Sequence, residues 1–543
     1  MQIADMERFF DRKSVLEPLK KRILDLKEGY RQNVALLGRR HIGKTVLLQK
    51  MMLDLDDEQL VPVYLDLENQ DLHDMAEKIS GRLLFHHVRR RGLPVADEVK
   101  ALVEITQPEL PTTYRCIKRI QSYLQHGKTP EAFREIISLP QIFAKESQSF
   151  CVLILDEFHA LDDLMIPGSF QELGKKIMTQ TRCLYVVASS LPEVTHRILS
   201  EKLSLLFGNF EIIALDVFDP KVSRAFIVDY FKDLRIKDSL INFLVDFTGG
   251  HPFFLNLICR EAVALTRIYQ QDEIYAPLVN QALENLLFQP WGILSGHFNL
   301  LIDQISRPRG HAMMGRLLTT LAGGKMKITQ IVKVLGLRQS QVSQRLRYLT
   351  EMNIVVRNGS FYYLADKVFK FWLKNVFQGR ESFLHLDPEL RRKQFRREVD
   401  CCLNQFVADF QKDLSSRIIE LLVCFEDEIC YINGRRYRLP LFLEIRPTVS
   451  REKVARDLNM IRACAQNGEW FVVFKTQPID ENDINTVLNE SRKQVVRPRK
   501  CILISLDHIE DHVRLRALQE RMWIWSEEEL NALLNIYNKP CIL

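Results

Sequence analysis

Eight residues in the first part of the chain have the types and the spacing of a phosphate-binding loop. They are Gly38, Arg39, Arg40, His41, Ile42, Gly43, Lys44 and Thr45, in the pattern Gly-x-x-x-x-Gly-Lys-Thr. An apolar stretch of strand type precedes them at 33–37, and a helix-type stretch without Gly or Pro follows at 46–52. A strand, a glycine loop and a helix N-terminus direct backbone N–H groups and the positive end of a helix dipole at one point. The pattern therefore predicts a polyphosphate site.

The ligand that suits this loop is ATP with Mg²⁺. Lys44 would reach the β- and γ-phosphates, and the Thr45 hydroxyl would hold the metal ion. The residues expected to bind the nucleotide here are the eight of the loop together with Val46. The alternative is a glycine turn that arose by chance, and the strand and helix on its two sides argue against it.

Two acidic residues follow a buried strand further along the chain. The apolar run at 150–155 ends in Asp156 and Glu157, at the carboxyl edge of the predicted sheet, where open α/β sheets bind their ligands. Asp156 would hold Mg²⁺ together with Thr45. Glu157 would orient and polarise the attacking water, because hydrolysis needs a carboxylate beside the metal that is not itself a ligand. The alternative role of the pair is a helix N-cap.

A further strand, at 183–190, carries hydroxyl groups at its tip. They belong to Ser189 and Ser190. The catalytic role predicted for Ser189 is to sense the γ-phosphate, and the alternative is to cap the helix that follows Pro192.

Composition sets the limits for the rest of the chain. The 543 residues are too many for one core. Hydrophobic residues make up 46% and charged residues 27%, which is ordinary for a globular protein, and the net charge of +6 permits an anionic partner. Apolar runs are too short for a membrane span, and the N-terminus lacks the features of a signal peptide. Eleven cysteines without a Cys-x-x-Cys pair favour reduced thiols. We expect a cytoplasmic protein without membrane contact.

Several segments in a fixed order resemble the archaeal-type ATPases, a branch of the STAND/AAA-like P-loop NTPases. They are Phe10-Asp11-Arg12, the phosphate loop, the strand ending in Asp156-Glu157, the strand ending in Ser189-Ser190, and Thr248-Gly249-Gly250-His251-Pro252-Phe253. The resemblance covers about residues 9 to 377. It implies that the Gly-Gly-x-Pro segment lies in a helical lid, that Pro252 contacts the nucleotide base, and that Arg12 lies on the adenine side.

The sequence departs from that family at one place. Relatives often have a Gly-Arg pair after the strand with hydroxyls at its tip, and this chain has Gly208 followed by Asn209. An arginine that would stabilise charge in the transition state is missing there. Arg197 or Arg224 would have to replace it, or hydrolysis would be slow.

Residues 314–364 predict a winged helix-turn-helix. Helix-type stretches at 314–322, 328–335 and 340–349 precede two strand-type stretches joined by Asn358 and Gly359, a favoured hairpin turn. The third helix has a polar face whose side-chain types read bases and phosphates. The DNA-binding residues predicted on it are Gln341, Gln344 and Arg347. The alternative is a winged helix that only packs against other parts of the protein.

The last part of the chain resembles, more weakly, the restriction-endonuclease-like (PD-(D/E)xK) domains that archaeal-type ATPases often carry. Glu444-Ile445-Arg446 stands where Glu-x-Lys would, but arginines occupy the place of the second metal-binding carboxylate. Asp427 and Glu428 are the only nearby replacements. We interpret the domain as a nuclease-like fold that has lost catalysis and keeps a basic face, including the run at 390–397, for DNA. A helix is expected at 452–466.

Together these features predict an α/β multidomain protein built on a P-loop NTPase parallel sheet. The parts are a P-loop ATPase core at 1–218 with a helical insertion at about 72–147, a helical lid at 219–300, a winged helix-turn-helix at 301–380, and a degenerate nuclease-like α/β domain at 381–543. The leading function is an ATP-binding and ATP-hydrolysing switch associated with DNA. The alternatives are an ATP-gated metal-dependent nuclease and a STAND-type protein-interaction switch without DNA contact. Homo-oligomers and a protein partner are compatible with each.

Overall fold

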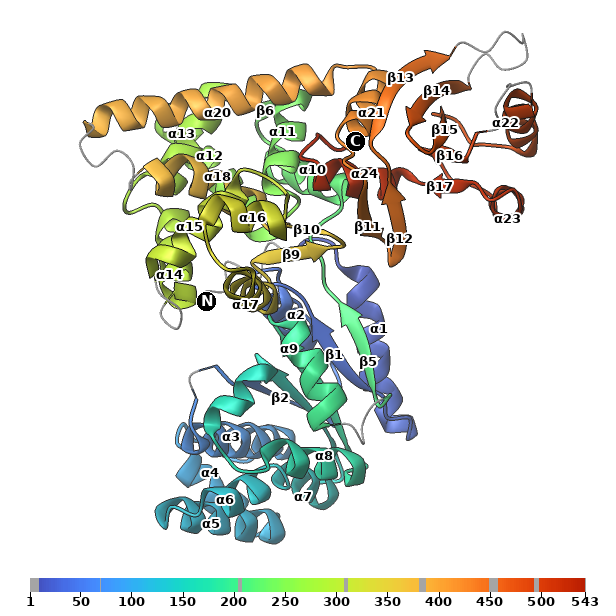
Figure 1. Ribbon diagram of the computed structural model, residues 1–543. Helices are drawn as coiled ribbons and strands as arrows, with labels where there is room; N and C mark the ends of the chain where they lie inside the picture. Colours follow the sequence, from blue (N-terminus) through green and yellow to red (C-terminus); the bar gives the residue numbers. More distant parts are fainter. Residues whose placement is uncertain are drawn as a thin grey trace. The chain divides into compact units, whose positions relative to one another are not determined.

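The computed structural model describes residues 9–68, 70–203, 208–306, 311–379, 387–448, 458–492 and 498–542. The chain divides into two compact units (Figure 1). Unit 1 contains Met1–Phe218 and His251–Phe253, and unit 2 contains Asp219–Gly250 and Phe254–Leu543. The predicted boundaries of the four domains stay a prediction.

Unit 1 is built on a five-stranded sheet in the order β2-β3-β4-β1-β5. Its strands are β1 (Asn33–Leu37), β2 (Leu60–Asp66), β3 (Phe150–Asp156), β4 (Cys183–Ser189) and β5 (Phe210–Ala214). All neighbours in it run parallel. Leu37 is in register with Ser189, and Asp66 with Asp156. Because the carboxyl ends of parallel strands meet at one edge, the phosphate loop, the acidic pair and the hydroxyl tip come together.

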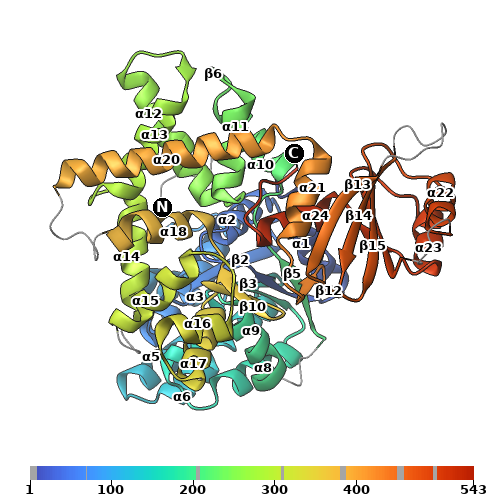
Figure 2. The same cartoon turned by 45° about the horizontal axis from the view of Figure 1, so that its top comes forward.

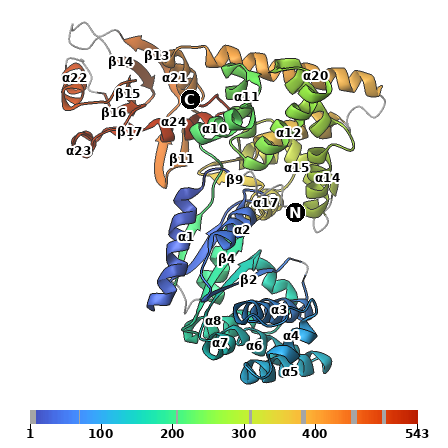
Figure 3. The ribbon, with the colours of Figure 1, turned by 180° about the vertical axis from the view of Figure 1, so that it is seen from behind.

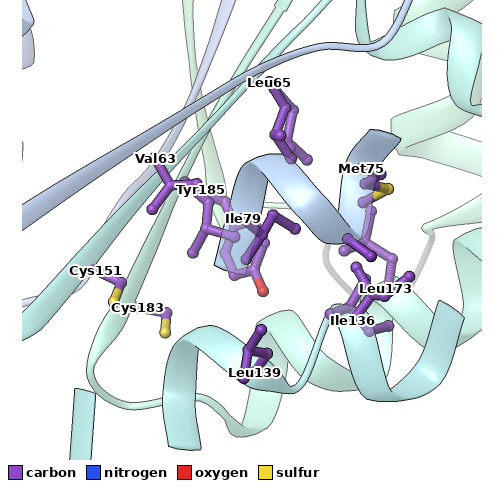
Figure 4. Close-up of a cluster of buried hydrophobic side chains, with 14 of the residues drawn as sticks. Val63, Leu65, Met75, Ile79, Ile136, Leu139, Cys151, Leu173, Cys183 and Tyr185 are labelled. Atoms are coloured by element: carbon purple, nitrogen blue, oxygen red, sulfur yellow. The ribbon is translucent and has the colours of Figure 1, made fainter. Parts of the chain in front are cut away.

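The two faces of this sheet are both covered by helices, which explains the unbroken apolar run of β3. Val152 and Ile154 face the side covered by α1 (Lys13–Asp25) and α2 (Lys44–Asp54). Leu153 and Leu155 face the helical insertion. Figure 4 shows this second core, where Tyr185 of β4 lies among side chains of the insertion.

The stretch predicted to be a helical insertion does hold helices, and they gather beside β2 (Figures 1 and 3). They are α3 (Leu72–Arg91), α4 (Val99–Thr106), α5 (Pro111–Gln125), α6 (Thr129–Ile136) and α7 (Leu139–Glu146). The remaining helices of unit 1 include η3 (Phe158–Leu164), α8 (Ser169–Thr179), α9 (Pro192–Arg197) and η4 (Ile198–Lys202).

Unit 2 begins with helices, which run to α14. They are α10 (Pro220–Tyr230), α11 (Asp238–Thr248), α12 (Pro252–Ile268), α13 (Ala276–Leu283), η6 (Glu284–Phe288) and α14 (Ile293–Ser306). A small parallel pair, β6 (Arg235–Ile236) and β7 (Glu273–Ile274), lies among them. The long helix α20 (Pro388–Phe410) contacts α11 and α13 and crosses this group in both views (Figures 1 and 2).

Three helices and a small antiparallel sheet follow, at the places predicted for the helix-turn-helix. The helices are α15 (His311–Ala322), α16 (Ile328–Leu335) and α17 (Gln339–Glu351). The sheet has the order β8-β10-β9, from β8 (Met326–Lys327), β9 (Val355–Asn358) and β10 (Phe361–Leu364). We call the β9–β10 hairpin the wing. After it come α18 (Lys367–Trp372) and η7 (Leu373–Phe377).

The rest of unit 2 contains α21 (Leu414–Val423), a separate hairpin and a five-stranded mixed sheet. The hairpin consists of β11 (Glu428–Ile432) and β12 (Arg435–Leu439). The sheet has the order β13 (Phe442–Thr448), β14 (Asn459–Ala465), β15 (Gly468–Lys475), β16 (Lys500–Ser505) and β17 (Trp523–Trp525). Its first two pairings are antiparallel and its last two parallel. Helices α22 (Glu481–Arg492), α23 (Asp511–Gln519) and α24 (Glu527–Ile536) complete it.

The helix expected at 452–466 is wrong over 459–465, which form β14. This strand lies between two antiparallel partners and is buried on both faces, because Met460 packs in one core while Ile461 and Ala463 pack in another. Adjacent buried positions remove the alternation that marks a half-exposed strand, and the remaining spacing imitates a helix. Residues 452–457 of the expected helix lie outside the described residues.

The wing turn is docked onto the free edge of β11. Asn358 accepts a hydrogen bond from the Tyr431 N–H at 2.6 Å and donates to the Tyr431 carbonyl oxygen at 2.9 Å. The Ser360 N–H donates to the Ile429 carbonyl oxygen at 3.2 Å. The side-chain amide of Asn358 thus replaces a neighbouring strand, which satisfies backbone groups that an edge strand leaves unpaired.

Gly359 is required in this turn for two reasons. Its φ angle is +58°, which favours glycine, and a Cβ atom there would lie 1.9 Å from the Ile429 carbonyl oxygen. Gly434, in the β11–β12 turn, has a φ angle of +74° and open space around the corresponding position. The two Asn-Gly turns therefore share a left-handed glycine and differ in whether a neighbouring backbone lies against it.

We predict that Gly359→Ala destabilises the protein more than Gly434→Ala does. Both substitutions force alanine into the left-handed region at a cost of about 1 kcal/mol, and only Gly359→Ala also displaces β11. Thermal unfolding of the two variants measures the difference. Equal shifts of the melting temperature would show that the wing turn is not docked.

Candidate nucleotide site

Lys44 is buried at the centre of the phosphate loop. It is 4% exposed, and its Nζ donates to the carbonyl oxygens of Gly38 and Arg39 at 3.0 Å each. Burial lowers the pKa of Lys44, while the negative charges of Glu157 and Asp156 favour its protonated form. The ammonium group is therefore held by two backbone oxygens, and an anionic oxygen in the loop would replace them favourably.

Asp156, at the end of β3, joins α2 and β2 to this strand. Its Oδ2 accepts hydrogen bonds from the Thr45 hydroxyl at 2.7 Å and from the Tyr64 hydroxyl at 2.8 Å. Burial, and next the charge of Asp156, raise the pKa of Tyr64, so the phenol keeps its proton and donates it. A hydroxyl and a carboxylate in contact are oxygen donors of the kind that Mg²⁺ prefers.

Glu157 lies beside this pair in a left-handed conformation, with a φ angle of 48°. Its Oε2 accepts a hydrogen bond from the Ser190 N–H at 2.9 Å and lies 3.5 Å from Nδ1 of His159. Burial is the largest influence on His159 and lowers its pKa, which favours the neutral ring. The carboxylate that is predicted to polarise water is thus oriented by the tip of β4.

Ser189 is fully buried. Its Oγ accepts a hydrogen bond from the Leu191 N–H at 3.1 Å and lies 3.0 Å from Nδ1 of His159. These contacts fix the turn before α9, which is the structural alternative to γ-phosphate sensing. The sensing role stays a prediction.

The other predicted nucleotide contacts lie around the loop. Arg40 forms an ion pair with Glu68 at 2.8 Å. His41 stacks on Phe253 with ring centroids 4.7 Å apart, so the segment that contains Pro252 lies against the loop. Arg12 lies elsewhere, over the ring of Phe218, and donates to the Asp216 carbonyl oxygen at 2.6 Å. The contacts of Arg12 and Pro252 with a nucleotide base stay a prediction.

Sequence reasoning missed Tyr64, His159 and the ion pair of Arg40 with Glu68. Tyr64 lies two residues before Asp66, which is in register with Asp156. Because side chains two apart share one face of a strand, parallel pairing of β2 with β3 would have placed Tyr64 near the acidic pair. Arg224, a suggested replacement for the missing arginine, binds Asp238 at 2.6 Å within unit 2.

The three predicted DNA-binding residues are exposed at successive turns of α17. They are Gln341, Gln344 and Arg347. The basic run at 390–397 is different, because Arg392 and Arg396 both bind Glu284, whose side chain is 0% exposed. These two arginines neutralise a buried carboxylate and do not contribute to the open basic face that the sequence suggested, whereas Lys393 and Arg397 are exposed.

Glu444 forms an ion pair with Arg446, two residues along β13. The two acidic residues that were to replace its missing partner are bound elsewhere. Asp427 pairs with Arg438 at 3.0 Å, and Glu428 pairs with Lys325 at 2.6 Å. In the described ranges there is no group of three His, Cys, Asp or Glu residues placed to hold a metal ion.

Comparison with known families identifies two segments. Residues 9–258 match the ATPase domain found predominantly in Archaea, and residues 315–356 match the helix-turn-helix of the bacterial arsR regulatory family. The chain therefore carries an archaeal-type ATPase domain, as the resemblance predicted, and an ArsR-type helix-turn-helix at the place where a helix-turn-helix was predicted. The nuclease-like resemblance stays a prediction. Among curated proteins, the comparison found no match.

The chain is also similar to solved structures. The Walker-type ATPase PABY2304 of Pyrococcus abyssi aligns with a TM-score of 0.50 and 16% identity, over 68% of this chain and 96% of that one. The ORC2 protein of Aeropyrum pernix, in ADPNP and ADP complexes, aligns with a TM-score of 0.42 and 13% identity, over 74% and 97%. The RuvB Holliday junction branch migration motor of Thermotoga maritima aligns with a TM-score of 0.34 and 15% identity, over 68% and 96%.

The first of these likenesses supports the fold alone, an α/β protein with a parallel central sheet of the P-loop NTPase type and a helical part. Among the described residues, no helix is both long and apolar enough to cross a membrane.

We predict that Tyr64→Phe weakens the response to Mg²⁺ by about tenfold or more, the usual scale for a residue that orients a metal ligand. The substitution removes one of the two hydroxyls on Asp156 Oδ2 and keeps the ring. A Mg²⁺ titration of nucleotide hydrolysis measures the effect. Tyr114→Phe, in α5, is the control, and an unchanged Mg²⁺ midpoint in Tyr64→Phe would exclude the role.

Proposed function

We propose that the protein binds and hydrolyses ATP and uses this reaction as a switch on DNA. The observation that carries the proposal is the cluster of Lys44, Thr45, Asp156 and Glu157 at one edge of a parallel sheet. It combines a cation for phosphates, a hydroxyl–carboxylate pair for a hard metal ion and a second carboxylate beside that pair. This combination has the parts that phosphoryl transfer to water requires.

The residues fit Mg²⁺, since Thr45 and Asp156 present two oxygen donors in contact with each other. Bound there with ATP, the ion would neutralise negative charge on the β- and γ-phosphates. Tyr64 would hold the Asp156 carboxylate in place by its second hydrogen bond. Lys44 would exchange the carbonyl oxygens of Gly38 and Arg39 for phosphate oxygens.

Glu157 is the general base in this proposal. A general base must reach the proton that it removes, and it must not be used up as a metal ligand. The Ser190 N–H orients the carboxylate through Oε2. His159, kept neutral by burial, would accept or donate a hydrogen bond without adding a full positive charge beside Glu157. Ser189 would then sense the γ-phosphate through its contacts with the His159 ring and the Leu191 N–H.

The DNA association is supported by the ArsR-type helix-turn-helix match and by the exposed polar face of α17. Recognition helices contact base edges and phosphates through side chains of the Gln and Arg types. In the switch, ATP would change how the helical lid and the winged helix-turn-helix lie against the ATPase core. Homo-oligomers and the four predicted domains belong to this proposal as well.

A second candidate is an interaction switch in which the helix-turn-helix serves packing only. The docked wing favours it, because Asn358 and Ser360 use the wing turn to bind β11. The face of α17 remains exposed, and this favours the DNA-associated switch. A nuclease is the third candidate, and the ion pair of Glu444 with Arg446 argues against it.

We predict that Lys44→Ala abolishes ATP binding while Glu157→Gln retains it. The first variant removes the cation that meets the phosphates. The second keeps the shape of Glu157 but removes the base, so hydrolysis should fall by about 10²-fold to 10⁴-fold. Equilibrium binding of a fluorescent ATP analogue and steady-state phosphate release separate the two effects. Wild-type ATP affinity in Lys44→Ala, with an unchanged melting temperature, would contradict the assignment of the loop.

We predict that the protein binds duplex DNA with a steep negative dependence on salt, because phosphate contacts release counterions. Replacing Gln344 and Arg347 by Ala should weaken binding, whereas Arg316→Ala on α15 should not. Fluorescence anisotropy with a labelled duplex, in the Glu157→Gln background with and without ATP, tests this. Absence of binding at low salt in every nucleotide state would favour the packing candidate.

A further inference from the structure

We infer that the turn end of the β11–β12 hairpin is a second nucleic-acid contact, which binds the sugar–phosphate backbone of the duplex engaged by α17. We call this turn end the arginine hairpin; it consists of Tyr431, Arg435 and Arg436. The inference rests on the proposed DNA association and adds to it a surface that neither the sequence resemblance nor the family matches assign.

The wing itself is used for docking. Its turn meets the edge of β11 through both polar atoms of the Asn358 side chain, and the Ser360 N–H donates to Ile429. Phe361 of β10 is 1% exposed and belongs to the same core as β11 and β12. The turn of the wing therefore packs against protein, and the element that it packs against is the β11–β12 hairpin.

The hairpin has one apolar face and one polar face. Cys430, Ile432, Tyr437 and Leu439 are buried in the core. On the opposite face Tyr431 is cross-strand to Arg436, and Ile429 is cross-strand to Arg438. Tyr431 is 49% exposed, and Arg436 is exposed beside it. Arg435 is cross-strand to Ile432, on the apolar side, and is exposed because it lies at the turn end. An aromatic ring beside guanidinium groups is a combination that suits phosphates and sugars.

The arginines of this strand are not equivalent. Arg438 forms a two-point contact with Asp427, at 3.1 and 3.0 Å, so its charge is compensated. Arg436 forms no ion pair with the described residues, and an exposed arginine without a counter-charge retains its full attraction for an anion. Arg357 of the wing, also exposed, packs 5.9 Å from the Tyr362 ring and extends the positive charge toward α17.

A buried cluster holds the hairpin in a fixed position relative to the helix-turn-helix. Glu428 of β11 has a side chain that is 1% exposed, and Lys325, which precedes β8, binds it at 2.6 Å. Tyr537 donates its hydroxyl to the same carboxylate oxygen, and the Lys325 ammonium lies 3.9 Å from the Tyr537 ring centroid. A charged pair in a dry site requires good geometry to be stable, so the arginines are presented at one place.

The elements form a continuous series within unit 2. Helix α17 contacts β9, β9 contacts β11, and β11 pairs with β12 (Figure 1). Neighbouring strands lie about 4.8 Å apart, so β12 lies roughly two strand spacings, about 10 Å, from the wing turn. That distance is comparable to the Debye length of about 8 to 10 Å at physiological salt. In the inferred complex, a duplex bound on α17 extends past the wing turn and across this distance to Arg435 and Arg436.

The test is the double variant Arg435→Ala, Arg436→Ala in the full chain, with a labelled mixed-sequence duplex about three helical turns long. The loss of two phosphate contacts should make the negative slope of log affinity against log salt shallower by about 1.8. The ratio of the wild-type affinity to the variant's affinity should therefore fall about tenfold when salt is raised from about 50 to about 200 mM. Arg514→Ala, Arg516→Ala on α23 removes the same charge elsewhere and should leave the slope unchanged.

The outcomes separate this inference from the proposed function. If Gln344→Ala, Arg347→Ala weakens binding while the hairpin variant keeps the wild-type affinity and slope, the hairpin inference is overturned and the DNA association stands. If the wild type binds no duplex, both fail. If the hairpin variant keeps duplex binding and loses affinity for polyglutamate, the surface serves an acidic protein and the inference is overturned. Arg436→Lys should retain most of the slope, since its charge is kept.

Discussion

The carboxylate of Asp156 is the contact on which the site depends. Its Oδ2 joins the first residues of α2 to the ends of β2 and β3, through the hydroxyls of Thr45 and Tyr64. Asp156 is 2% exposed, and a buried carboxylate is stable only when its oxygens are hydrogen-bonded or paired. The phosphate loop and the acidic pair are therefore held together by the same groups that would receive a metal ion. The same hydrogen bonds thus stabilise the fold and orient the oxygen atoms that the proposed chemistry uses.

Much of unit 1 could be predicted from the sequence because its signals are local. The phosphate loop fixes a strand, a turn and a helix within twenty residues, and the doubly buried strand β3 shows as a continuous apolar run that ends in two acids. Tyr64 and His159 could not be found this way. Their roles depend on which strands are neighbours and in what register, and pairing between distant strands leaves no trace in spacing along the chain.

The errors in unit 2 have a related cause. The run at 390–397 reads as an open basic face because its partner, Glu284, lies about a hundred residues earlier and carries no local mark. The strand β14 reads as a helix because both of its faces are buried. In each case a contact between distant parts of the chain overrides a local pattern. The Asn358-Gly359 turn shows the opposite: its sequence predicts the hairpin correctly, and the docking of that hairpin on β11 appears only in the folded structure.

Two buried carboxylates explain why the later parts of the chain fold as one unit. Glu284 receives Arg392 and Arg396 from α20, and Glu428 receives Lys325 and Tyr537. Replacing one partner of such a pair typically costs 3–5 kcal/mol, because the remaining charge stays buried without compensation. The helical part, the helix-turn-helix and the C-terminal strands cannot separate from one another without exposing or isolating these charges. In the proposed switch, α17 and the arginine hairpin would therefore move together, since both belong to unit 2.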